Sequence, residues 1–178
     1  MTITEASPST AGSHRGPANL RTGGTSPSPL ELLELVRTYS EEMRDLLPLA
    51  GPELRERSYE LLELTNDIEI WAIHWPKDRG LELHDHGGSS GALWVIDGTL
   101  SEHSVSSGGA LSSRSIDVGA GTAFGPGYIH DVVNTDDVVA TSVHIYSPPM
   151  ASMTFYRQQG ASLVVERAEY RADPSWAP

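Results

Sequence analysis

The sequence contains no cysteine among its 178 residues. This absence excludes disulfides, thiol nucleophiles, cysteine-ligated zinc and iron–sulfur clusters. Long apolar runs are absent as well, since no segment approaches the ~20 residues that span a bilayer. The N-terminus also lacks the apolar stretch of a secretory signal peptide. We therefore expect a cytoplasmic protein that does not enter a membrane.

Positive charge is scarce. The chain has 12 basic and 24 acidic residues, which gives a formal net charge of −12. Nucleic acids and anionic membrane surfaces are bound by concentrated positive charge, so we expect neither as a partner. Nothing in the sequence indicates an obligate protein partner. A chain of this length suffices for one domain with a substantial core.

The N-terminal part of the chain has two sections. Residues 1–28 are rich in Ser, Thr, Gly and Pro, and such a composition predicts a disordered leader. Ser28 followed by Pro29 is typical of a helix N-terminus. Apolar residues recur from there at helical spacing as far as Leu47, which predicts a helix. We expect residues 29–60 to form a helical cap, with residues 52–59 helical or irregular.

The rest of the chain has the character of β-strands. β-branched and aromatic residues dominate several short runs that are separated by Gly, Pro, Asn and Asp. Asp97-Gly98 is a candidate turn. Close spacing of short strands predicts a sandwich or small barrel, which we place at residues 61–170, with a C-terminal tail over 171–178. The clearest runs are 68–75, 92–96, 138–146 and 162–165.

Histidines form the most informative pattern. His84 and His86 are one residue apart, so on a strand their side chains would point to the same side. His130, from another strand, would complete a group of three nitrogen ligands. With no carboxylate or thiolate added, such a group leaves a metal ion open coordination positions, which indicates a redox or Lewis-acid centre. His74 and His103 are expected to be structural.

These residues match the two-part signature of the cupin barrel. His84, His86 and Gly98 fit the first part, although Gly91 stands where a metal-binding Glu is usual, and Gly119, Gly127, His130 and Asn134 fit the second. The segment Ser142-Val143-His144-Ile145-Tyr146-Ser147-Pro148-Pro149 narrows the match. Over roughly residues 58–157 the chain resembles cysteine dioxygenase, a mononuclear non-haem iron enzyme. The predicted fold class is therefore mainly β, a cupin (small jelly-roll) barrel with an N-terminal helical cap.

The resemblance implies a function and a set of residues. His84, His86 and His130 would bind Fe(II), Tyr146 would place its hydroxyl beside the substrate, His144 would orient that hydroxyl, and Ser142 would support His144. The implied reaction oxidises L-cysteine with O2 to cysteine sulfinate, with both oxygen atoms coming from O2. The resemblance also implies a cis peptide bond at Ser147-Pro148. Mammalian members of the family join a cysteine, at the position of Gly91, to the tyrosine by a thioether. That crosslink to Tyr146 cannot form here, because the chain has no cysteine.

Substrate binding is the less determined part of the site. The family binds the substrate carboxylate with an arginine that lies upstream of the first metal histidine. Arg57 and Tyr59 are the expected substrate-binding residues here, and Arg79 and Arg157 are further candidates for the arginine.

Three classes of function remain open at this point. The first is a thiol dioxygenase, acting on L-cysteine or on another small thiol acid such as 3-mercaptopropionate. The second is a non-oxidative metal-dependent cupin, an isomerase or lyase that uses Zn, Ni or Mn as a Lewis acid. The third is a cupin that binds a ligand without turnover. The Ser-x-His-x-Tyr-Ser-Pro-Pro segment favours the first class, because the other two have no use for it.

Overall fold

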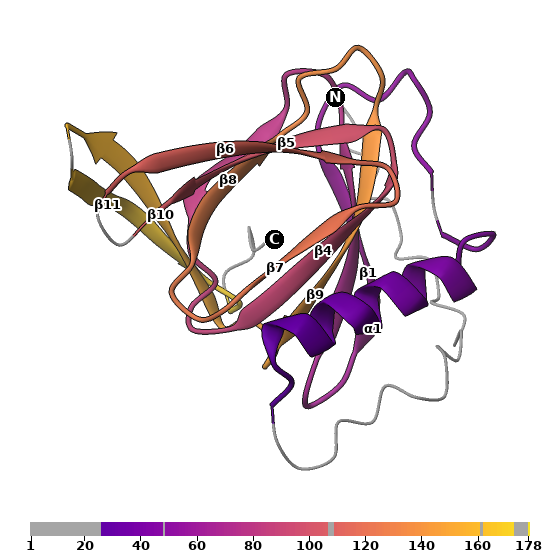
Figure 1. Ribbon diagram of the computed structural model, residues 1–178, viewed down its shortest axis with the longest axis horizontal. Helices are drawn as coiled ribbons and strands as arrows, with labels where there is room; N and C mark the ends of the chain where they lie inside the picture. The colour runs from indigo at the N-terminus through magenta and orange to yellow at the C-terminus, as the bar shows by residue number, and fades with distance from the viewer. Residues whose placement is uncertain (1–25, 48, 107–108, 161, 173–177) are drawn as a thin grey trace, which may run out of the picture.

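The computed structural model describes residues 26–47, 49–106, 109–160, 162–172 and 178 (Figure 1). The predicted leader lies almost entirely outside the described residues, as do residues 173–177 of the predicted tail. The described residues contain one helix, α1, and eleven strands. Their bounds are α1 Pro29–Glu42, β1 Ser58–Leu64, β2 Glu69–Trp75, β3 Gly80–His84, β4 Ser90–Asp97, β5 Thr99–Val105, β6 Leu111–Asp117, β7 Gly121–Phe124, β8 Ile129–Val133, β9 Ala140–Ser147, β10 Ser152–Gln159 and β11 Ser162–Tyr170.

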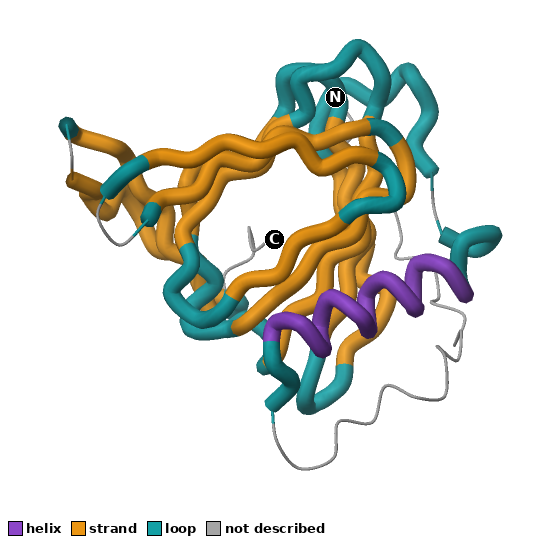
Figure 2. The backbone as a smooth tube through the Cα atoms, viewed as in Figure 1, coloured by secondary structure: helices purple, strands orange, loops and turns teal. Residues whose placement is uncertain are grey.

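The strands form two antiparallel sheets. One sheet has the order β1-β2-β9-β4-β7 and the other has the order β11-β10-β3-β8-β5-β6. Figure 2 shows the two sheets facing each other around a common interior, with the β10–β11 hairpin extending beyond the barrel wall. Consecutive strands such as β3 and β4 lie in different sheets, so the chain crosses repeatedly between them. This arrangement confirms the predicted cupin-type barrel with a helix near its N-terminus.

Helix α1 covers the outer face of the five-stranded sheet (Figure 1). It begins as predicted: Ser28 is the N-cap, Pro29 is the first helical residue, and Glu31 completes a capping box with Ser28. The predicted end at Leu47 is wrong, because the helix stops at Glu42 and residues 43–46 form turns. Those turns let Leu47 pack into the core under the helix while Leu46 stays exposed.

Two apolar clusters hold the molecule together. The outer cluster joins α1 to the sheet through Leu32, Val36 and Tyr39 of the helix and residues such as Val143 and Ile145 of β9. The inner cluster fills the barrel and surrounds the polar side chains described below. Its buried members are Trp71, Ile73, Trp75, Leu93, Val95, Leu100, Ile116, Phe124, Val132, Ala140, Tyr146, Met150, Met153 and Phe155.

The barrel starts earlier than residue 61, the start that the sequence predicted. Strand β1 begins at Ser58, so residues 58–60 belong to the sheet and not to the helical cap. Residues 52–57 are irregular, which was one of the two expected conformations. Tyr59 and Glu60 pair with Ile73 and Ala72 of β2, and this ladder is what draws residues 58–60 into the sheet. The turn at Asp97-Gly98 and the cis peptide bond at Ser147-Pro148 are both present as predicted.

Candidate metal centre

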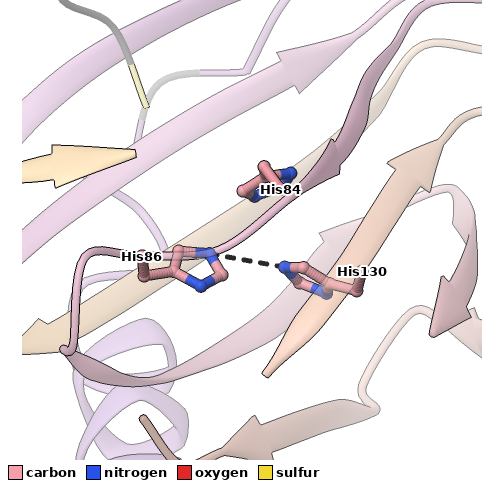
Figure 3. Close-up of side chains that lie close together, drawn as sticks. All are labelled: His84, His86 and His130. Carbon is pink, nitrogen blue, oxygen red and sulfur yellow. Dashed lines mark hydrogen bonds between the residues drawn. The ribbon is translucent and has the colours of Figure 1, made fainter. Parts of the chain in front are cut away.

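Three histidines meet inside the barrel (Figure 3). His84 is the last residue of β3 and lies opposite His130 of β8 in the strand register. His86 follows in the loop after β3, so it reaches the same site from a loop and not, as predicted, from a strand. One ligand nitrogen from each ring lies within 4.8 Å of the others, and the Nε2 atoms of His86 and His130 are 3.4 Å apart. All three residues are buried.

Hydrogen bonds fix which nitrogen His84 and His130 present to the site. Nδ1 of His84 lies 2.7 Å from the carbonyl oxygen of Glu82, and Nδ1 of His130 lies 2.7 Å from Oε1 of Glu102. A carbonyl or an ionised carboxylate can only accept, so each Nδ1 carries the proton and donates it. The lone pair of each ring is therefore on Nε2, which faces the shared site. Such outer contacts orient a histidine for metal binding.

The electrostatic environment keeps the rings of His84 and His86 neutral. Burial, followed by the positive charge that His130 would carry, lowers the pKa of His84 well below its usual value. Burial also lowers the pKa of His86 well below its usual value, with a further effect from His84 and His130. A neutral imidazole is the form that binds metals. His84 and His86 thus offer neutral nitrogen donors to the site.

No carboxylate joins the cluster among the described residues. Gly91, at the position where a metal-binding Glu is usual in cupins, has no room for a side chain. A Cβ atom built there would lie 2.5 Å from Cζ of Phe124 and 2.9 Å from Cδ1 of Tyr146. The donor set is therefore three nitrogens, which suits iron, zinc, copper or nickel and leaves positions open for other ligands.

The acidic residue nearest to this set was missed by the sequence analysis. Glu102 of β5 is only 1% exposed, and besides His130 its carboxylate accepts a hydrogen bond from the guanidinium of Arg114. Burial opposes the ionisation of Glu102, but the hydrogen bonds from His130 and Arg114 outweigh it and lower its pKa. The local sequence gives no signal for it, because Glu102 lies in a polar stretch and its two partners come from strands β8 and β6, which pair with β5.

A line of hydrogen bonds runs along the inner face of β9. Nε1 of Trp75 donates to Oγ of Ser142 over 2.9 Å, Oγ of Ser142 lies 2.8 Å from Nε2 of His144, and Nδ1 of His144 lies 3.1 Å from the hydroxyl of Tyr146. Ser142, His144 and Tyr146 are thus brought together as predicted, on one face of one strand. Trp75 is an additional member that the sequence did not identify.

Tyr146 lies beside the histidines. Its ring centroid is 5.2 Å from that of His86. Burial and the nearby Glu69 raise the pKa of the Tyr146 hydroxyl, so it stays protonated. Burial, together with the charges of His130 and Arg57, lowers the pKa of His144 to about 3, so its ring is neutral at physiological pH.

The structure separates the three candidate arginines. The guanidinium carbon of Arg57 lies 5.4 Å from the ring centroid of Trp75 and 5.9 Å from that of Tyr59. Its charge is among the causes that lower the pKa of His84 and His144, although burial is the largest. By contrast, two exposed ion pairs occupy Arg79 and Arg157, which contact Glu56 and Glu166 respectively.

The surroundings of Arg57 contain two further features. Its Nη1 donates to the backbone oxygen of Pro178 over 2.6 Å. Tyr59 is 42% exposed and lies edge-on to Trp71, at a centroid distance of 6.1 Å. Nε1 of Trp71 is buried, with no hydrogen-bond partner among the described residues. Arg57 and Tyr59 therefore lie at one end of the barrel interior, next to an unused N–H donor.

The fold and the three-histidine site define a metal-dependent cupin. The chain belongs to the cysteine dioxygenase type I family, whose model matches residues 31–159. In the described part of the chain, no helix is long and apolar enough to cross a membrane.

Solved structures with the same fold include two enzymes that act on oxalate. An oxalate oxidase in complex with the substrate analogue glycolate has 16% identity and a TM-score of 0.53, with 61% of this chain and 59% of that chain covered. The oxalate decarboxylase from Bacillus subtilis has 17% identity and a TM-score of 0.50, with 58% of this chain and 28% of that chain covered. This chain thus spans less than two thirds of either protein, and at such identities the likeness concerns the fold alone.

Proposed function

We propose that the protein is a non-haem Fe(II)-dependent thiol dioxygenase, with L-cysteine as its leading substrate. In the overall reaction a thiol and O2 give a sulfinic acid, RSH + O2 → RSO2H, which is balanced without an external reductant. The observation that carries the proposal is the Tyr146 hydroxyl, held by His144 and Ser142 beside three histidines that no carboxylate of the described residues joins. A cupin that acts only as a Lewis acid, or only binds a ligand, has no need for this arrangement.

The donor set fits ferrous iron. Imidazole nitrogens suit iron as well as zinc, copper and nickel, and the family to which the chain belongs favours iron among them. When bound at His84, His86 and His130, ferrous iron supplies the electronic route by which O2 reacts with a thiolate.

Tyr146 would act as a hydrogen-bond donor. Trp75 can only donate to Ser142, so the arrangement that uses every donor has Ser142 donating to Nε2 of His144 and Nδ1–H of His144 donating to the Tyr146 oxygen. The proton of the Tyr146 hydroxyl is then left for the substrate. A donor fixed in advance in a buried site stabilises developing negative charge more than water does.

Arg57 would hold the carboxylate of the substrate. Among the candidate arginines, Arg57 is the one whose charge lowers the pKa of His84 and His144. Guanidinium groups bind carboxylates with paired hydrogen bonds. The substrate carboxylate would replace the backbone oxygen of Pro178 that Arg57 now contacts. Tyr59, next to Arg57, would line the same end of the cavity.

An oxygen electrode tests the proposal. Protein loaded anaerobically with Fe(II) is mixed with L-cysteine, 3-mercaptopropionate or cysteamine, which has a thiol and no carboxylate. We expect O2 uptake with L-cysteine and little uptake with cysteamine. Uptake with 3-mercaptopropionate shows whether the alternative substrate is also accepted, and the two rates decide which thiol acid is preferred. With ¹⁸O2 the sulfinate should carry both labelled atoms. Protein loaded with Zn(II) is the control, and a lack of uptake with every thiol would contradict the proposal.

A further inference from the structure

Glu102 is a buried carboxylate in contact with a metal ligand. We propose that it is a positioning residue of the metal centre, which delivers negative charge to the ion through His130. In the part of the chain that the structure describes, no carboxylate joins the three histidines directly. The inference rests on the metal site of the proposed function but not on thiol oxidation.

The contacts of Glu102 leave it little freedom. Its Oε1 lies 2.7 Å from Nδ1 of His130 and 3.4 Å from the hydroxyl of Tyr128, and its Oε2 accepts from Nε of Arg114. Both residues of the His130–Glu102 pair are almost fully buried, at 2% and 1% exposure. A charge held this far from water interacts strongly with its neighbours. The carboxylate is therefore held in place, and its negative charge acts on His130 at short range.

The ligand histidines differ in what holds their outer nitrogen. His84 donates to a neutral backbone carbonyl, whereas His130 donates to a carboxylate. Hydrogen bonds to an ionised group are roughly twice as strong as those between neutral groups. A ring that donates such a bond gains electron density, and its other nitrogen becomes a stronger metal ligand. His130 should therefore be a stronger metal ligand than His84.

Gly91 explains why the charge has to come through a histidine. Atoms of Phe124 and Tyr146 occupy the space where a side chain at this position would begin. Glu102, from a different strand and on the far side of His130, supplies a carboxylate without occupying a coordination position. The site thus keeps its open positions and still receives part of a negative charge.

Arg114 weakens the effect of Glu102 on His130, because it contacts the other oxygen of the same carboxylate. Its side chain is about half exposed, and it also donates to the hydroxyl of Thr122. Its positive charge withdraws density from Glu102 and so opposes the effect of Glu102 on His130. Changes at Glu102 and at Arg114 should therefore shift metal binding in opposite directions.

A matched control is present on the same two strands. His103 of β5 and Asp131 of β8 pair at 2.6 Å, next in sequence to Glu102 and His130 respectively. Because side chains alternate along a strand, this second histidine–carboxylate pair lies on the opposite face of the sheet, and both side chains are partly exposed. It therefore shares the strand pairing of the first pair without contact with the metal site.

The experiment measures binding of Co(II) to the full-length apoprotein by its absorption spectrum. For Glu102→Gln, which keeps the shape and loses the charge, we expect affinity to fall about 10–100-fold. Asp131→Asn should leave affinity unchanged. In the diamagnetic Zn(II) protein, the NMR resonance of the His130 Nδ1 proton should move upfield in Glu102→Gln, because its hydrogen bond weakens. None of these measurements requires turnover, so the inference can fail or hold independently of thiol oxidation.

A second variant covers the case in which Glu102→Gln does not fold. Arg114→Gln changes a half-exposed residue, and we expect it to bind Co(II) more tightly than the wild type. Unchanged affinity in either variant would overturn the inference. An equal loss in Asp131→Asn and Glu102→Gln would overturn it as well, since the effect would then come from the strand pairing.

Discussion

Strand β9 presents two faces that are equally buried and differ in chemistry. Every residue from Ala140 to Ser147 is buried. On the outer face, Val143 and Ile145 pack against α1 and the strands beneath it. On the inner face, Ser142, His144 and Tyr146 form a hydrogen-bonded line next to the metal site.

The difference shows that the outer face of β9 stabilises the fold and that the inner face builds the site. The outer face removes apolar surface from water, which stabilises the fold. The inner face buries polar groups, which costs free energy unless each one is hydrogen-bonded. Its hydrogen bonds offset that cost and also orient the Tyr146 hydroxyl. Substitutions on the inner face should therefore change turnover, and those on the outer face should change the free energy of unfolding.

The largest effect is expected for Tyr146→Phe on the inner face. Loss of the hydroxyl removes a fixed donor, and kcat for the thiol substrate should fall about 10²–10³-fold. Iron content should not change, because Tyr146 is not among the nitrogen donors. Iron analysis and O2 uptake on the same sample check this. If iron is lost and the rate per iron stays the same, the role assigned to Tyr146 is wrong.

On the outer face, Ile145→Ala should lower the free energy of unfolding by about 2–5 kcal/mol, because it leaves a cavity in a fully buried cluster. The kcat per folded molecule should stay at the wild-type value. Urea unfolding followed by tryptophan fluorescence gives the first quantity, and O2 uptake well below the unfolding transition gives the second. A loss of kcat comparable to that of Tyr146→Phe would break the division between the faces.

An intermediate effect is expected for Ser142→Ala. The change leaves Nε2 of His144 and Nε1 of Trp75 without their partner, so the Tyr146 hydroxyl loses its fixed orientation. We expect kcat to fall about tenfold, in line with about 1–3 kcal/mol for a buried group left unpaired. Ser147→Ala is the matched control, since this serine is on the outer face and donates to the carbonyl of Asp67. Equal losses of kcat in both variants would contradict the assignment.

The same two-face pattern explains what could be predicted from the sequence. The alternation of Ser142, His144 and Tyr146 with Val143 and Ile145 is local, so it is readable without a structure. The histidine set was also readable, because two of its members are separated by a single residue and the third belongs to a recognisable motif. The cupin barrel followed from those motifs together with the spacing of the strands.

Features that depend on distant strands were not predictable. Glu102 lies in a polar stretch, and its partners His130 and Arg114 come from β8 and β6, which only the register of the sheet brings next to β5. Choosing among Arg57, Arg79 and Arg157 likewise needed coordinates, because the sequence does not show which guanidinium points inward. Helix α1 ends before the apolar pattern does, because Leu47 reaches the core through a turn.

The smallest effect is expected for a change in helix α1, which covers the outer face of the sheet. Ser28→Ala removes the side chain that accepts from the backbone N–H of Glu31 and caps α1. We expect a loss of about 1 kcal/mol in the free energy of unfolding, the usual contribution of an N-cap. Ser28→Asp, which can also cap, should retain the stability. Because α1 packs on the outer face of the sheet, kcat should be the same in both variants, and a fall in kcat for Ser28→Ala would mean that the helix also shapes the interior.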